Sequence, residues 1–193
     1  MIAQPEVKRY TAEEYLELEV ASETRNEYRD GEMIPMTSGT PEHNRISGNL
    51  YITLSLGLKG KPYETFHVDQ RLWIPSVSLY TYPDVMVLTK PLELQAGRKD
   101  TVINPCFIAE VLSQSTQNYD RGDKFVAYRT IPTFQEYLLV DQSKIHVEHH
   151  VKVAENQWLF SEYDDPTVIL CLRVLELSIQ ILDLYENIEF SNI

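Results

Sequence analysis

Two acidic residues of this sequence stand in apolar surroundings, where a charge is costly to keep. Asp84 opens the apolar run of TYPDVMVL, and Glu110 lies in the middle of NPCFIAEVL. A lone buried carboxylate costs several kcal/mol or takes up a proton instead. Each acid is therefore expected to have a partner, either a basic side chain or a metal ion.

The alternation of side chains along a strand brings the two acids toward one site. Asp84 shares a strand face with Met86 and Leu88, and Glu110 shares one with Cys106, Ile108 and Leu112. If the two strands are neighbours, they lie about 4.8 Å apart and both carboxylates reach the same place. Two close carboxylates repel each other unless a cation lies between them. A hard divalent ion with oxygen ligands, such as Mg²⁺, meets that need.

Each acid also has an ordinary structural explanation. Asp84 follows Pro83 and could occupy a turn or begin a strand, and Glu110 could pair with a buried arginine. For one acid alone these explanations are the better ones. The presence of both acids at the edge and in the middle of two apolar strands favours a shared site.

The segment DRGDKFVAYR supplies a candidate cation, Lys124. On a helix, Lys124 shares a face with Asp120 and with Tyr128. One interpretation is a solvated ion pair between Asp120 and Lys124, worth a few tenths of a kcal/mol. The other turns Lys124 inward, where its ammonium stabilises negative charge on a phosphate or orients an attacking water.

Other groups with chemical potential are weaker candidates. In HVEHH, residues His146, Glu148 and His150 share a strand face and could bind zinc, but no further ligand is evident and an exposed strand is expected. Ser113 and Ser115 follow Glu110 without a glycine-flanked nucleophile elbow. They are expected to bind backbone in a loop or to line the site.

The elements that position these residues follow from caps, turns and periodicity. TAEE is a capping-box pattern that opens a helix over residues 12–20. RDGE places a two-residue Asp-Gly turn in a hairpin over residues 25–36. TP provides the N-cap and first residue of a second helix, which runs from residue 41 to about residue 59.

Apolar and β-branched segments predict strands for most of the remaining chain. The expected strands span residues 63–68, 71–74, 82–88, 106–112, 135–140, 145–153 and 158–163. A third helix is expected over residues 120–131, before Pro132, and a short one near residues 182–187. This order predicts an α/β fold of mixed, α+β character, with a mostly antiparallel sheet, in a single domain over residues 1–193.

Composition limits the function classes. Net charge is −12, from 17 basic and 29 acidic residues, whereas nucleic-acid binders usually carry a basic surface. Residues 155–193 alone hold eight acids and one base, a balance of −7, so acidity is densest in the tail. No apolar run approaches the ~20 residues of a membrane helix, and the N-terminus lacks an apolar signal region. Cys106 and Cys171 are expected to be reduced core thiols, and the protein is expected to be cytoplasmic.

Several of these segments together resemble the Uma family of bacterial restriction-endonuclease-like proteins. The resemblance rests on RNEYRDGEMIPM, PEHNRISGNL, YPDVMVL, FIAEVLSQST and DRGDKFVAYRTIPTFQEYLLVDQ, and it spans roughly residues 10–185. It implies the fold of the PD-(D/E)XK nuclease superfamily, a restriction-endonuclease-like core in which helices flank a central mixed sheet. It also implies Mg²⁺-dependent hydrolysis of DNA phosphodiester bonds, with Mn²⁺ as a substitute ion.

The resemblance assigns roles to particular residues. Pro83-Asp84 matches the first half of the superfamily signature, and Glu110 matches the acid of the next core strand. The signature lysine would stand two residues after Glu110, where this chain has Leu112. In the Uma family the lysine has moved to the following helix, which implies that Lys124 takes its place.

Two further residues match family positions nearer the N-terminus. Glu27 could be an additional metal ligand, or an exposed charge on a hairpin. His43 could contact a substrate phosphate or assist a water, or it could make a structural hydrogen bond within its helix. Neither alternative is favoured by the sequence.

Two hypotheses about function follow. The first is an endonuclease in which Asp84 and Glu110 hold the metal and Lys124 stabilises charge, with DNA contacts from basic residues such as Arg71, Lys90, Arg98, Lys99 and Arg121. A homodimer suits such an enzyme, because two sites related by a two-fold axis can cut both strands. The second is an inactive protein on the same fold with a regulatory or assembly role, which the net charge of −12 favours.

Overall fold

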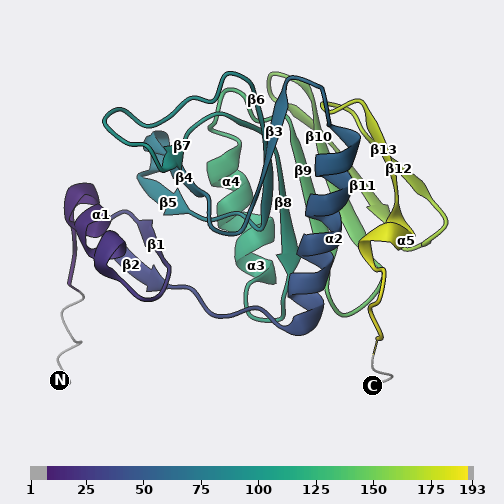
Figure 1. Ribbon diagram of the computed structural model, residues 1–193, viewed down its shortest axis with the longest axis horizontal. Coiled ribbons are helices and arrows are strands. Elements are labelled where there is room, and N and C mark those ends of the chain that lie inside the picture. Colours follow the sequence, from purple (N-terminus) through teal and green to yellow (C-terminus); the bar gives the residue numbers. More distant parts are fainter. Residues whose placement is uncertain (1–7, 191–193) are drawn as a thin grey trace.

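The computed structural model, which describes residues 8–190, contains a central six-stranded sheet with helices on both faces (Figure 1). In spatial order its strands are β11 (Gln157–Tyr163), β10 (Val147–Ala154), β9 (Glu136–Asp141), β8 (Pro105–Leu112), β6 (Val85–Thr89) and β3 (Tyr63–His67). β8 and β9 are parallel, and all other neighbours in this sheet are antiparallel. The predicted mixed α/β fold is confirmed.

Helices bury both faces of the central sheet. On one face, α2 (Pro41–Gly57) packs through Ile46, Leu50 and Leu54. The C-terminal elements β12 (Ile169–Leu172), β13 (Leu177–Gln180) and α5 (Ile181–Leu184) complete the same apolar core. On the other face lie α3 (Gln117–Tyr119), the π-turn η2 (Asp120–Lys124) and α4 (Phe125–Tyr128), which form one continuous helical segment.

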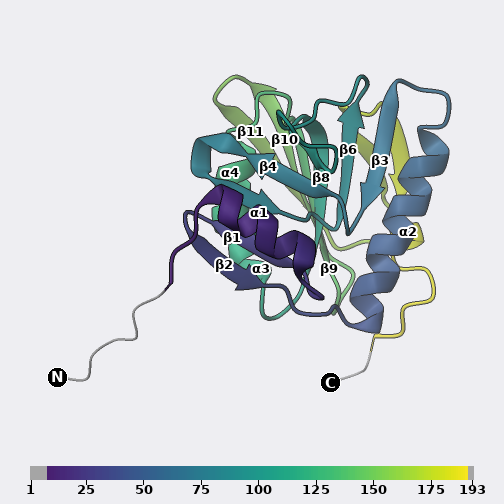
Figure 2. The same ribbon diagram turned by 60° about the vertical axis from the view of Figure 1, so that its left-hand side comes forward.

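A smaller sheet covers the α4 side of the molecule. Its strands, in spatial order, are β2 (Glu32–Pro35), β1 (Asn26–Arg29), β5 (Leu79–Thr81), β4 (Arg71–Ile74) and β7 (Thr101–Val102), with the short helix η1 (Pro75–Val77) between β4 and β5. The first helix, α1 (Ala12–Ala21), lies beside β1 (Figure 2). The ring of Tyr15 on α1 stacks on Tyr28 of β1 and on Tyr80 of β5, with ring centroids 5.2 and 5.1 Å apart.

The locally encoded elements occur as the sequence predicts. Thr11 and Glu14 form the capping box of α1, and the side chain of Thr40 caps α2. The hairpin of β1 and β2 turns at Asp30 and Gly31, which both have positive φ, as a two-residue turn of this kind requires.

The longer-range predictions contain errors. The strand expected over residues 82–88 begins only at Val85, and residues 79–81 form β5 of the other sheet. The helix expected over residues 120–131 begins at Gln117, ends at Tyr128 and is interrupted by η2. Neither β7 nor the pair of β12 and β13 was expected, because these strands are short and their partners or turns give little local signal.

The predicted faces and cysteine environments also need correction. Cys106 is buried on the α2 side, whereas Ile108 faces α4, because a register shift opposite Val87 and Leu88 turns the strand. Cys171 is exposed rather than part of the core. Within residues 8–190, each helix is too short or too polar to cross a lipid bilayer.

Candidate active site

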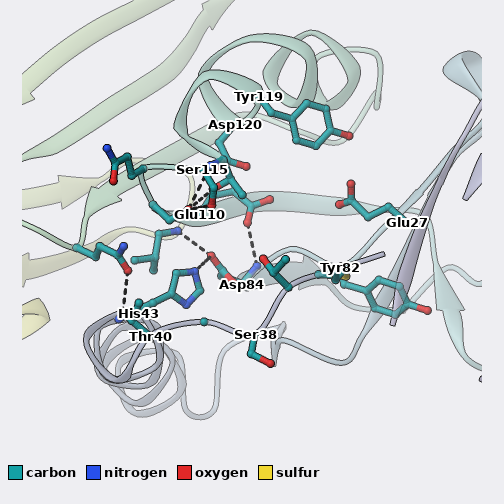
Figure 3. Close-up of a pocket in the computed structure, with 18 of the residues that line it drawn as sticks. Glu27, Ser38, Thr40, His43, Tyr82, Asp84, Glu110, Ser115, Tyr119 and Asp120 are labelled. Carbon is teal, nitrogen blue, oxygen red and sulfur yellow. Dashed lines mark hydrogen bonds and ion pairs between the residues drawn. The ribbon is translucent and has the colours of Figure 1, made fainter. Parts of the chain in front are cut away.

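A cavity of about 820 Å³ opens at the end of the central sheet where β6 begins and β8 ends (Figure 3). One rim is the segment of residues 34–40, which leads from β2 into α2. The opposite rim is the loop of residues 113–116, which leads from β8 into α3. Asp84, Glu110 and Lys124 all line this cavity, so the structure brings together the three residues that the sequence singles out.

The two acids occupy opposite positions on neighbouring antiparallel strands. The register of β6 and β8 pairs Val85 with Ala109, which places Asp84 opposite Glu110 just beyond the last paired residues. Glu110 Oε2 accepts a hydrogen bond from the N–H of Asp84 at 3.1 Å, and Asp84 Oδ2 accepts one from the N–H of Val111 at 2.8 Å. Each carboxylate thus accepts a hydrogen bond from a backbone N–H of the other strand, where the ladder between β6 and β8 ends. These bonds fix the position of both side chains relative to the sheet.

Lys124 is a buried partner of Glu110. It ends the π-turn η2, and its Nζ lies 3.1 Å from Glu110 Oε1, 3.2 Å from Asp120 Oδ1 and 3.6 Å from Glu27 Oε1. A π-turn adds a residue to a helical turn and often occurs at functional sites. The predicted ion pair with Asp120 exists, but it is buried rather than solvated, and Lys124 also faces the acid pair.

Two tyrosines, one on α4 and one on β9, complete the surroundings of Glu110 and Lys124. The hydroxyl of Tyr128 donates to Glu110 Oε1 at 2.6 Å, and both groups are buried. Tyr137, on β9, donates to the backbone carbonyl of Asp120 at 3.0 Å. Tyr128 is four residues after Lys124, so helical spacing indicated that it shares the Lys124 face but not that it reaches Glu110.

Burial and charge act differently on the two acids. Burial, together with the charges of Asp84 and Asp120, raises the pKa of Glu110 to about 8 against the opposing effects of Lys124 and Tyr128. Burial would also raise the pKa of Asp84, but hydrogen bonds from His43 and Val111 outweigh it and lower the pKa below its ordinary value. Without a further cation, Asp84 therefore carries its negative charge readily, whereas ionisation of Glu110 is disfavoured.

Lys124 remains charged in spite of its burial. Desolvation alone would lower the pKa of Lys124, but Glu110, Glu27 and Asp120 raise it well above its ordinary value. Three carboxylates around one ammonium leave an excess of negative charge at the base of the cavity.

His43 approaches the acid pair from the first turn of α2. Its Nε2 lies 3.2 Å from Asp84 Oδ2, and this contact outweighs burial and raises the pKa of His43. Its Nδ1 is buried and has no hydrogen-bond partner among residues 8–190. A Cβ at Gly39 would come within 2.8 Å of this Nδ1, so glycine allows the rim to pass close to the ring.

Glu27 is buried, not an exposed hairpin charge. The hydroxyl of Thr81 donates a hydrogen bond to Glu27 Oε1, and the same oxygen lies 3.6 Å from Lys124 Nζ. Figure 3 shows Glu27 between the rings of Tyr119 and Tyr82, apart from Asp84 and Glu110, which face each other. Glu27 thus contacts the lysine of the site rather than the acid pair.

The donor set of the cavity suits a hard divalent ion with a small number of protein ligands. Among the described residues, no three acidic, histidine or cysteine side chains converge as a ready-made set of metal ligands. Asp84 and Glu110 provide two oxygen ligands, and Mg²⁺ is commonly held by one or two carboxylates, with water and phosphate completing its shell. The excess negative charge beside Lys124 would be relieved by such an ion, so these residues fit Mg²⁺ or Mn²⁺.

The remaining sequence candidates divide between the cavity and the region of β10. Ser113 and Ser115 line the cavity, and Ser113 Oγ accepts a hydrogen bond from the N–H of Thr116. His146 and Glu148 are buried, which contradicts the expected exposed strand, because His146 contacts Asp164 and Glu148 pairs with Arg121.

None of the five basic residues considered for DNA contacts lines the cavity: Arg71, Lys90, Arg98, Lys99 and Arg121. Arg71 is buried and donates to the hydroxyl of Tyr82, so it is a structural residue. Arg121 pairs with Glu148 at 2.7 Å.

The structure adds residues that the sequence did not single out. Thr81 holds Glu27, and Tyr119 lines the cavity with a buried hydroxyl that has no hydrogen-bond partner within the described residues. No local pattern marks either residue, since each acquires its place through strands or helices far apart in the chain.

Comparisons with known proteins agree with this fold. The chain is 44% identical over 152 residues to the uncharacterized protein sll1609 of Synechocystis sp. (strain ATCC 27184 / PCC 6803 / Kazusa), covering 79% of this chain and 86% of that protein. It is 34% identical over 180 residues to the uncharacterized protein slr1290 of the same organism, covering 92% of each.

A solved structure and a family model extend the comparison. The crystal structure described as "a putative nuclease belonging to DUF820" from Anabaena variabilis ATCC 29413 has a TM-score of 0.74, covers 91% of this chain and 97% of its own, and is 19% identical. At that identity the likeness shows the fold. The model of the Uma2 family, described as "Putative restriction endonuclease", matches residues 12–184. The resemblance seen in the sequence is thereby confirmed, and the chain belongs to the Uma2 family.

Proposed function

We propose that this protein is a cytoplasmic, Mg²⁺-dependent endonuclease that hydrolyses phosphodiester bonds of DNA. One observation carries the proposal: the buried Glu110 and the half-buried Asp84 stand opposite each other on neighbouring strands, with the ammonium of Lys124 3.1 Å from Glu110.

Asp84 and Glu110 would hold the metal ion. When bound, Mg²⁺ lowers the pKa of a coordinated water and polarises the phosphate, and Mn²⁺ can substitute for it. The two acids are suited to this role because their backbone hydrogen bonds fix the distance between the strands. Glu27, through Thr81 and Lys124, supports the site from the second sheet.

Lys124 would act on the charge that develops during hydrolysis. Phosphoryl transfer places negative charge on the phosphate oxygens, and a fixed ammonium in a water-poor site stabilises it without reorganisation. Asp120 and Glu27 hold the ammonium in place beside Glu110. His43, on the other side of Asp84, lines the cavity and would lie beside a substrate phosphate.

Calorimetric titration with Mn²⁺ tests the metal site. The native chain should bind Mn²⁺, and the Asp84→Asn/Glu110→Gln double variant should not, with folding checked by circular dichroism. A matched control, Asp183→Asn/Glu155→Gln, removes the same charges from exposed positions outside the cavity and should bind like the native chain. Equal binding by native chain and folded double variant would contradict the proposal, and so would the absence of Mn²⁺-dependent cleavage of any DNA by protein that binds the ion.

A second candidate is an inactive nuclease-fold protein with a regulatory or assembly role. It is favoured by charge: the chain carries −12, and Lys124 is the single Lys or Arg among the cavity residues, where three acids already pair with it. This candidate predicts that metal binds without cleavage, or does not bind.

A further inference from the structure

The cavity has the size of a small-ligand site. Its volume of about 820 Å³ falls within the roughly 300–1,000 Å³ of pockets that enclose single small molecules. The reacting groups lie at its base, where Glu110 is 2% and Lys124 7% exposed. Duplex DNA is stiff over about 150 base pairs, so it does not fold into a pocket of this size, whereas an unpaired nucleotide does.

The charge of the cavity argues in the same direction. Proteins that bind duplex DNA neutralise several of its phosphates with Lys and Arg side chains. Here Lys124 is already shared by three carboxylates. Two arginines close to cavity residues, Arg29 over the ring of Tyr119 and Arg121 next to Asp120 in the chain, are paired as well. Arg29 lies 3.3 Å from Asp123, and Arg121 donates to Glu148. A long phosphate backbone would therefore find little positive charge at this opening.

Neutral hydrogen-bond donors line both rims instead. Hydroxyl groups come from one rim at Thr37, Ser38 and Thr40, and from the other at Ser113, Ser115 and Thr116. Hydroxyls and backbone N–H groups bind phosphate and sugar oxygens without a net charge. Thr37 and Ser38 are exposed, and neither side chain has a hydrogen bond to another residue of the described chain. They are free to contact one or two phosphates.

One side of the cavity is apolar and aromatic. Ile34, Pro35 and Met36 form the rim near β2, and the half-buried ring of Tyr119 lines the same cavity (Figure 3). Bases of single strands stack on such surfaces irrespective of sequence. The hydroxyl of Tyr119 has no hydrogen-bond partner within residues 8–190, and it would bond a polar group of a base or sugar that enters beside the ring.

We infer that the cavity takes unpaired DNA, either a single strand or an unpaired stretch within a duplex, and that it does not take an intact duplex. Hydroxyls of the two rims hold the flanking phosphates, and the apolar side receives a base. The inference rests on the proposed function, because that function places the scissile phosphate at Asp84 and Glu110.

Binding of labelled DNA measures this preference. Fluorescence anisotropy would compare a 15-nucleotide single strand, a hairpin duplex of the same sequence and a duplex with a central unpaired bubble, with Ca²⁺ in place of Mg²⁺. The single strand and the bubble should bind at least about tenfold more tightly than the duplex. Because the rims contact phosphates through neutral hydroxyls rather than Lys or Arg, few counterions are released, and log K should change little with log salt, unlike the steep fall of a duplex binder.

Removing the rim hydroxyls tests which groups hold the strand. The Thr37→Ala/Ser38→Ala variant should bind the single strand about three- to tenfold more weakly. The matched control Ser55→Ala/Ser161→Ala removes two hydroxyls outside the cavity and should bind like the native chain. Unchanged binding by the rim variant would overturn the assignment of the rims.

Equal or tighter binding of the duplex overturns the inference, and so does the absence of binding to all three DNAs. Cleavage assays with Mn²⁺ on the same substrates separate this result from the proposed function. If the duplex is cut and the single strand is not, the inference fails while the endonuclease stands. If protein with bound Mn²⁺ cuts none of them, the proposed function fails whatever the binding preference.

Discussion

Asp84 and Glu110 each bond to the strand that carries the other. Glu110 accepts from the N–H of Asp84 at 3.1 Å, and Asp84 accepts from the N–H of Val111 at 2.8 Å. This reciprocal arrangement closes the ladder of β6 and β8 with side chains where the backbone bonds end. It fixes both carboxylates inside the cavity, and it leaves Glu110 buried with more negative than positive charge around it.

The raised pKa of Glu110 predicts a pH-dependent stability in metal-free protein. The folded-state pKa of about 8 exceeds the ordinary 4.5, so the folded chain binds an extra proton between these values. The free energy of unfolding should therefore fall as pH rises from about 5 to 8. For the native chain this decrease in the free energy of unfolding amounts to about 2–4 kcal/mol, and the Glu110→Gln variant should not show it. Urea unfolding at four pH values measures it.

Metal should reverse this pH effect. Saturating Mn²⁺ should raise the stability of the native chain at pH 8 and leave Glu110→Gln nearly unchanged, since a ligand stabilises only the state that binds it. Glu155→Gln, at an exposed position, serves as the control and should follow the native chain. Parallel pH curves for the native chain and Glu110→Gln would contradict the raised pKa.

Local sequence signals were enough to find the acid pair. Asp84 and Glu110 stand out because each interrupts an apolar strand, and the capping box of α1 and the Asp-Gly turn are encoded by adjacent residues. Lys124 was identified as the catalytic candidate through family resemblance, since helical spacing alone fits a surface ion pair equally well. The structure shows it buried because η2 carries it over the end of β8.

Contacts between distant segments were beyond the reach of the sequence. Thr81 meets Glu27 across 54 residues, and Tyr128 reaches Glu110 across 18. The pairing of β4 with β7 is parallel, and β5 and β6 lie between these two strands in the chain. Such contacts are set by tertiary packing, which overrides the local preference of each short segment.

Replacing Lys124 should destabilise the protein as well as inactivate it. Lys124→Met leaves Glu110, Asp120 and Glu27 without their cation, and removal of one partner from a buried ion pair costs about 3–5 kcal/mol. Denaturant unfolding measures this loss. The double variant Lys124→Met/Glu27→Gln should recover part of it, because one uncompensated charge is removed.

The exposed Lys99→Met variant is the control, and its stability should change by less than about 0.5 kcal/mol. If Lys124→Met unfolds no more easily than Lys99→Met, the three carboxylates do not depend on the ammonium, and its role beside Glu110 must be reconsidered.

His43 should maintain the charge of Asp84. His43→Ala removes the hydrogen bond that lowers the pKa of Asp84, so the pKa of this acid should rise toward or above its ordinary value. Loss of a hydrogen bond to a charged group should also cost about 1.5–3 kcal/mol of stability. NMR titration of the Asp84 carboxyl carbon follows the pKa directly. His150→Gln, which does not contact Asp84, should leave it unchanged, and an unshifted pKa in His43→Ala would refute the pairing.

Removal of the Tyr119 hydroxyl tests whether this group serves the stability of the fold or the binding of substrate. Its OH is buried without a partner in the described chain, and an unsatisfied buried hydroxyl costs about 1–3 kcal/mol. Tyr119→Phe should therefore keep or raise the stability of the free protein, by up to about 1 kcal/mol, while it weakens single-strand binding about two- to tenfold. Tyr128→Phe provides the contrast, because its OH donates to Glu110 and its loss should destabilise the protein. If Tyr119→Phe instead loses stability and binds DNA normally, the hydroxyl serves the fold and not the substrate.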